Sequence, residues 1–93
     1  MTIFKNCNNI NHNDLINDGW EFREDHYEKT YKERLLNVNL NLLNSKEIEN
    51  IWMLKVNIST LNTQSVSLFY TVKTMSEIYD RADKAISEYE FYF

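Results

Sequence analysis

The chain contains one glycine, Gly19, and no proline among its 93 residues. A glycine-rich phosphate-binding loop needs several positions without a Cβ, so nucleotide sites of that class are excluded. Turns must be built from other residues, and thirteen asparagines are available for them. Asn, Asp and Ser tolerate turn conformations because their side chains bond to the nearby backbone. We therefore expect turns that rely on these three residue types.

Cysteine and histidine are almost as scarce. Cys7 is the only cysteine, which excludes an internal disulfide and a zinc site built on a CxxC pair, and suits a reducing cytoplasm. His12 and His26 lie 14 positions apart, with no partner at metal-ligand spacing. A thiol nucleophile needs a base beside it, and only Lys5 is near Cys7. We expect no metal, no cofactor and no enzymatic activity.

Long apolar runs and an excess of positive charge are also missing. No stretch approaches the ~20 apolar residues of a membrane-spanning helix, and residues 1–6 lack the features of a signal peptide. The chain has 10 Lys and Arg against 14 Asp and Glu, a net charge of −4. Nucleic-acid binding needs a concentrated positive patch. These features predict a cytoplasmic protein that binds neither membranes nor nucleic acid directly.

The length and the 43% apolar content predict one folded domain over residues 1–93. Within it, three segments are apolar at every second position, which is typical of strands with one buried face. The segments are 35–43, 51–59 and 66–73. Consecutive strands with short connections usually pair as an antiparallel meander. Residues 1–11 are polar, and are either a loose arm or a short strand.

Helix signals flank this region. Thr74 lies three residues before Glu77, the spacing of a capping box, and predicts a helix from Met75 to about Glu90. Its apolar residues recur at helical spacing and make one stripe. That stripe contains Ile78, Ala82, Ala85, Ile86 and Tyr89. A short helix over residues 14–18 is expected after Asn13, ending at Gly19. The predicted fold class is α+β: a meander of three to four strands packed against a C-terminal helix, with a short N-terminal helix.

Residues 24–35 fit two structures. Read as a helix, they place Asp25 four residues before Lys29, with further ion pairs at the same spacing. Read as a strand, their alternate residues share one face that is out of phase with the run starting at Leu36. That face carries Tyr27, Lys29, Tyr31, Glu33 and Leu35. A continuous strand would then need a bulge. We favour the strand, because no break residue separates the two stretches.

One face of the predicted sheet points away from the C-terminal helix. It carries Asn37, Asn39, Asn41, Ile51, Met53, Lys55, Ser67, Phe69 and Thr71. Two arrangements are open: residues 1–22, with Phe4, Trp20 and Phe22, fold across this face, or part of it stays exposed as a docking surface. Exposed apolar patches usually mark partner sites.

The exposed side of the C-terminal helix is the other candidate surface. It is rich in carboxylates and is followed by an aromatic tail. The predicted partner-binding residues are Glu77, Asp80, Asp83, Glu88, Glu90, Phe69, Phe91, Tyr92 and Phe93. Spaced carboxylates can take the place of phosphates in a basic groove, and their field speeds association. The expected partner is a larger protein, for example one that handles nucleic acid.

The profile as a whole is small, acidic, rich in Asn and Tyr, α+β and without catalytic motifs. It resembles phage-encoded accessory proteins, including anti-CRISPR and other counter-defence inhibitors. That resemblance implies an inhibitor that binds and blocks a larger protein, and no motif transfers a role to any residue. The alternative is a self-assembling homodimer that pairs through a sheet face or an edge strand. A small enzyme centred on Cys7, a tyrosine or a histidine is the third possibility.

Overall fold

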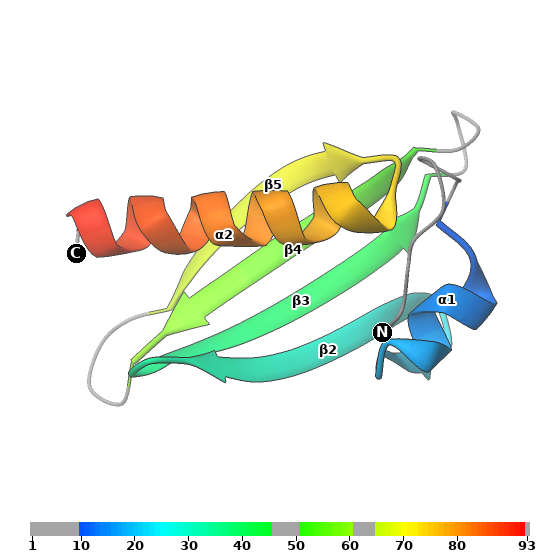
Figure 1. Ribbon diagram of the computed structural model, residues 1–93, viewed down its shortest axis with the longest axis horizontal. Coiled ribbons are helices and arrows are strands. Elements are labelled where there is room, and N and C mark those ends of the chain that lie inside the picture. The colour runs from blue at the N-terminus through cyan, green and yellow to red at the C-terminus, as the bar shows by residue number, and fades with distance from the viewer. Residues whose placement is uncertain (1–9, 46–50, 61–64, 93) are drawn as a thin grey trace.

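The computed structural model describes residues 10–45, 51–60 and 65–92, and folds them into a sheet with helices on one side (Figure 1). In chain order the elements are α1 (His12–Asn17), β1 (Glu21–Arg23), β2 (His26–Glu33), β3 (Leu36–Asn44), β4 (Trp52–Ser59), β5 (Val66–Val72) and α2 (Met75–Tyr92). This confirms the α+β class. The predicted arm, apart from residues 10 and 11, lies outside the described residues, as do Cys7 and Phe93.

The sheet is an antiparallel meander in the order β1-β2-β3-β4-β5. The three strongly alternating segments are β3, β4 and β5, as predicted, and the described sheet has five strands where three to four were expected. The extra strands come from residues 21–33. Residues 26–33 are therefore a strand, in agreement with the favoured interpretation.

Sharp turns, and no bulge, explain the change of phase near Leu36. β2 ends at Glu33, β3 begins at Leu36, and these two residues are partners across the hairpin. Arg34 and Leu35 form the turn between them, and Arg34 has a φ of 58°. The expectation of a bulge was wrong, because the two alternating runs lie on different strands and need not share a phase. Glu24, with a φ of 39°, begins the matching two-residue turn between β1 and β2.

α2 packs its apolar stripe on β4 and β5 and closes the core (Figure 1). Ile78, Ala82 and Ala85 are fully buried against strand residues such as Leu54 and Val56. The N-terminal cap forms as predicted: the backbone N–H of Glu77 donates to Thr74 Oγ1 at 3.2 Å, and the Glu77 carboxylate accepts from the N–H of Lys73.

α1 lies on the same side of the sheet as α2 (Figure 1). It begins two residues earlier than predicted, because Asn11 and not Asn13 is its cap: Asn11 Oδ1 accepts from the N–H of Asp14 at 2.9 Å. Gly19, with a φ of 90°, ends it as expected. Leu15 and Trp20 are buried in the core beneath α1. Residues 10–20 therefore extend the helix layer and residues 21–23 extend the sheet as β1, so this segment does not cover the opposite face of the sheet.

Candidate functional site

The side of the sheet that faces away from the helices, here called the outer face, carries a ladder of amides and hydroxyls across four strands. The register aligns Thr30, Asn39, Asn57 and Ser67 in one row. Asn39 Nδ2 donates to Thr30 Oγ1 at 2.9 Å, Asn57 Nδ2 donates to Asn39 Oδ1 at 3.2 Å, and Ser67 Oγ donates to Asn57 Oδ1. Asn41 Nδ2 donates to Asn39 Oδ1 as well. The ladder thus holds its own polar groups in fixed orientations.

Apolar side chains lie beside this ladder on the outer face. Phe69 on β5 is 64% exposed, Met53 on β4 is 43% exposed, and Leu43 on β3 is 41% exposed. Leu43 and Met53 are direct cross-strand partners. Phe69 lies on β5, two residues from Thr71, the partner of Met53, and is therefore diagonal to Met53. Lys55 extends over Phe69, with Nζ 5.9 Å from the ring centroid. Phe69, Met53 and Leu43 therefore form an exposed apolar cluster with a cation at its border.

Most charge on the outer face lies at the β1–β2 end, where Arg23 pairs with Glu21 and Glu28. Glu28 on β2 receives a hydrogen bond from Asn39 Nδ2 at 2.8 Å and another from Arg23 at 3.3 Å. The hydrogen bond from Asn39 is the largest effect and lowers the pKa of Glu28; burial opposes it, and the charge and hydrogen bond of Arg23 lower the pKa further. The centre of the face is consequently amide, hydroxyl and apolar, with Lys55 as its one charge among the described residues of β3, β4 and β5.

The five predicted acids of α2 are spread around the part of the helix that is not buried against the sheet. Glu77 is part of the N-terminal cap, and Glu90 pairs with Arg34 from the β2–β3 turn. Successive helix residues are 100° apart, which directs Asp83 toward β2, Glu88 toward β5, and Asp80 away from the sheet. The influence of Asp83 on the Tyr31 pKa and of Glu88 on the Tyr70 pKa agrees with this placement.

The predicted aromatic anchors are likewise separated. Phe69 lies on the outer face, and the sheet separates it from α2 and its acids. Phe91 is 80% exposed near the end of α2. The Tyr92 side chain and Phe93 lie outside the described part of the chain. A single flat partner surface cannot contact both Phe69 and the α2 acids.

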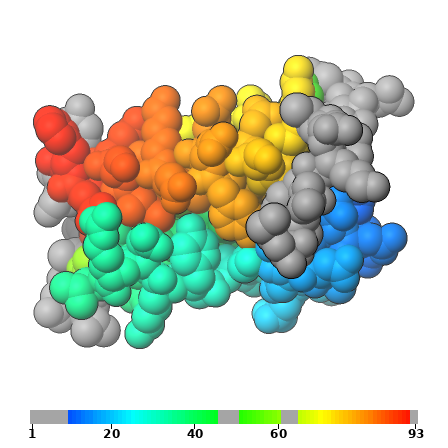
Figure 2. Space-filling model, in the orientation of Figure 1, coloured from blue at the N-terminus to red at the C-terminus, as the bar shows by residue number. Residues whose placement is uncertain are grey.

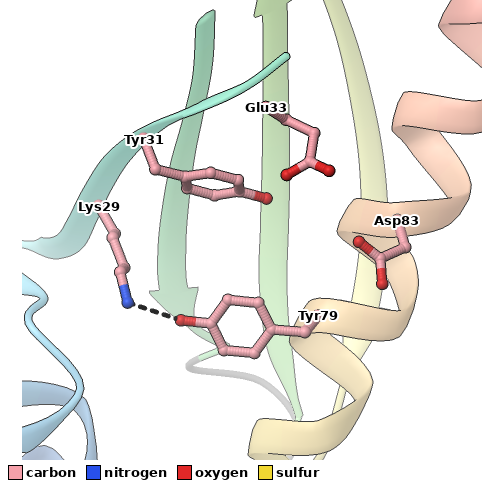
Figure 3. A pocket seen from close by; sticks show the side chains of 5 residues that line it. All are labelled: Lys29, Tyr31, Glu33, Tyr79 and Asp83. Carbon is pink, nitrogen blue, oxygen red and sulfur yellow. Dashed lines mark hydrogen bonds between the residues drawn. The ribbon is translucent and has the colours of Figure 1, made fainter. Parts of the chain in front are cut away.

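A groove that the sequence did not indicate opens between β2 and α2, on the side of the molecule seen in Figure 2. It has a volume of about 330 Å³ and is lined by Lys29, Tyr31, Glu33, Tyr79 and Asp83 (Figure 3). Lys29 Nζ donates to Tyr79 Oη at 3.0 Å and lies 3.4 Å from the Asp18 carboxylate. The strand interpretation already placed Tyr31 and Glu33 on one face, but which element they meet depends on the sheet order.

Both tyrosines of the groove are hard to ionise. Burial, followed by the charge of Asp83, raises the pKa of Tyr31 to about 12. Burial and the hydrogen bond to the Asp18 carboxylate raise the pKa of Tyr79 well above its usual range. Each therefore presents a neutral ring and hydroxyl near neutral pH.

The histidines have structural contacts. His12 Nδ1 lies 2.6 Å from Tyr27 Oη and its ring packs against Phe22, while His26 Nδ1 lies 2.8 Å from Asp25. In the ranges that the structure describes, no three His, Cys, Asp or Glu residues are grouped closely enough to hold a metal ion. Neither α1 nor α2 has the length and apolar character that crossing a membrane would require.

Comparison with known protein families, with curated proteins and with solved structures finds no match to this chain. The functional argument therefore depends on the surfaces described above.

Proposed function

We propose that this protein binds a larger protein through the outer face of its sheet and thereby blocks that partner. The observation that carries the proposal is the exposed cluster of Phe69, Met53 and Leu43 beside the amide ladder. Residues 10–20, which could have covered this face, pack on the other side, and residues 21–23 form the edge strand β1. An exposed apolar cluster with a polar border is typical of a partner-binding surface.

The composition of the face supports a protein partner. The centres of protein interfaces are depleted in charge and enriched in aromatic residues and Met. Around Phe69 and Met53 the neighbouring side chains are Asn, Ser and Thr, with Lys55 as the exception. The ladder amides already bond to one another, so burying them leaves few polar groups without a partner. The face can therefore be desolvated at low cost.

The proposed consequence is inhibition in the cytoplasm. It is supported by the resemblance in size, acidity and composition to phage-encoded counter-defence inhibitors. A protein with extents of 37 × 33 × 24 Å presents a face large enough for a standard interface of about 800 Å² per partner. Such an interface would block a partner's own binding surface without any chemistry on this chain.

The experiment compares two phenylalanines on opposite sides of the molecule. The tagged wild type, Phe69→Asp and Phe91→Asp are used as bait in a bacterial lysate, and each captured protein is quantified. An aromatic residue at the centre of an interface contributes about 2 kcal/mol or more, so Phe69→Asp should lower the captured amount at least about tenfold. Phe91→Asp should leave it unchanged. Both positions are exposed, so both variants should stay folded, and thermal melts of each check this. Equal capture by Phe69→Asp and the wild type would refute this use of the outer face.

Self-association is the second candidate, and the sheet edge favours it. β5 has β4 as its one neighbour in the described sheet, so its other edge presents backbone groups that a second copy could pair. Mass measured by sedimentation over a concentration series separates the two functions. A mass that rises to that of a dimer, with no protein captured from the lysate, would replace the inhibitor by the homodimer.

A further inference from the structure

β2 and α2 each line the groove between them with one tyrosine and one carboxylate (Figure 3). β2 contributes Tyr31 and Glu33, two residues apart and therefore on one face of the strand. α2 contributes Tyr79 and Asp83, four residues apart and therefore neighbours on the helix surface. The groove thus combines two tyrosine rings with two carboxylates.

The cation already in the groove does not neutralise these carboxylates. The Lys29 ammonium pairs with Asp18 at 3.4 Å, and donates to the Asp18 carbonyl oxygen at 2.6 Å and to Tyr79 Oη at 3.0 Å. Figure 3 shows Lys29 at one end of the groove, and Glu33 and Asp83 toward the other. None of the ion pairs within residues 10–45, 51–60 and 65–92 includes Glu33 or Asp83. That end of the groove therefore has a negative charge that a ligand can compensate.

The two tyrosine rings of the groove also favour the binding of a cation. Tyr31 and Tyr79 are partly buried, and their raised pKa values keep them neutral, so their rings offer the negative faces that attract cations. Lys29 Nζ lies 5.5 Å from the Tyr79 ring centroid but 3.0 Å from Tyr79 Oη, so this ammonium contacts the hydroxyl end of the ring and not its face. Tyr31 contributes a ring beside both carboxylates, and the charges of Asp83 and Glu33 act on its hydroxyl.

We propose that this groove binds the side chain of an arginine presented by a partner protein. A guanidinium is planar, stacks on aromatic rings, is weakly hydrated, and pairs with carboxylates through several N–H groups at once. An ammonium is a compact, strongly hydrated charge and loses more on entering a groove between rings. The inference goes beyond the proposed function, because the groove lies on the helix side of the sheet and does not involve Phe69 or the amide ladder.

The test uses N-acetyl-arginine amide as the probe and needs no partner. The compound is titrated into isotopically labelled protein, and backbone amide shifts are followed by NMR. Saturable shifts should be confined to residues around the groove on β2 and α2, with a Kd in the millimolar range, about −4 kcal/mol. Asp83→Asn and Glu33→Gln should each raise that Kd by about two- to fivefold, as expected for a partly exposed ion pair. Asp80→Asn, the same change on the side of α2 away from the sheet, is the matched control and should leave it unchanged.

Three results would overturn the inference. The first is the absence of a saturable shift up to about 50 mM probe, well above the expected Kd. The second is equal weakening by Asp80→Asn and Asp83→Asn, which would show a general charge effect. The third is equal affinity for N-acetyl-lysine amide, which would remove the assignment to a guanidinium. Any of these would leave the capture experiment with Phe69→Asp unaffected, so the two proposals fail separately.

Discussion

Asp18 connects three segments of the helix side. Its carboxylate accepts hydrogen bonds from Trp20 Nε1 at 3.0 Å and from Tyr79 Oη, and it pairs with Lys29 at 3.4 Å. The residue lies just after α1, Lys29 is on β2 and Tyr79 is on α2. One partly buried carboxylate thus fixes the end of α1 against the other two elements, and holds Tyr79 and Lys29 where they line the groove.

The raised pKa of Tyr31 predicts a loss of stability at alkaline pH. Tyr31 deprotonates near pH 10 when unfolded and near pH 12 when folded. Between these values the folded state binds more protons, so the free energy of unfolding falls as the pH rises through that window, and is unaffected below it. Tyr31→Phe removes this titration and should show a shallower decline. Urea midpoints measured on either side of pH 10 check this. The same decline of the midpoint with pH in the variant and in the wild type would contradict it.

At the scale of elements, the two hairpins of β2 are made by residues poorly suited to their turns. Two-residue hairpin turns need positive φ angles and favour Gly or Asn. Here the first turn residues are Glu24, at 39°, and Arg34, at 58°. Left-handed backbone at a non-glycine residue costs on the order of 1 kcal/mol. These turns form because the strands that they join pair in register, and the core face of β2 packs against the rest of the sheet.

Glycine at the first turn should therefore stabilise the fold. Glu24→Gly relieves the left-handed strain but adds unfolded-chain entropy, so we expect a gain of about 0.5 kcal/mol in the free energy of unfolding. Arg34→Gly should gain less, because it also removes the ion pair with Glu90. Urea denaturation of both variants measures the difference. A clear destabilisation by Glu24→Gly would show that the turn is not strained.

Some elements of the fold could be predicted from the sequence and others, including these turns, could not. The sequence predicted β3, β4, β5 and α2, because strict alternation and a capping box are patterns that can be seen in the local sequence. The hairpins around β2 could not be predicted, because Glu24 and Arg34 give no turn signal. The outer-face positions of Asn39 and Phe69 followed from their phase in the alternation. The groove could not be predicted, because the proximity of Tyr31 to Tyr79 depends on the strand order and on where α2 crosses the sheet.

At the scale of the whole molecule, the sheet divides two surfaces of different character. The helix side contains the acids of the groove, with Glu33 and Asp83 outside any described ion pair. The outer face has amides and apolar groups at its centre. The idea that Phe69 anchors the same interface as the α2 acids therefore has to be divided into two separate contacts. A partner that used both would have to reach around an edge of the sheet.

Amide hydrogen exchange should show which strand edges of the sheet are unpaired. β3 and β4 are paired on both sides and contain the fully buried Leu40 and Val56, so their amides should exchange most slowly. β1 has three exposed residues and should exchange fastest among the strands. Along β5 only alternate amides face β4, so protection should vary with a period of two. Uniform protection along β5 at high protein concentration, lost on dilution, would instead show that a second copy pairs with this edge. Periodic protection at every concentration would leave the outer face, and not the edge, as the surface available to a partner.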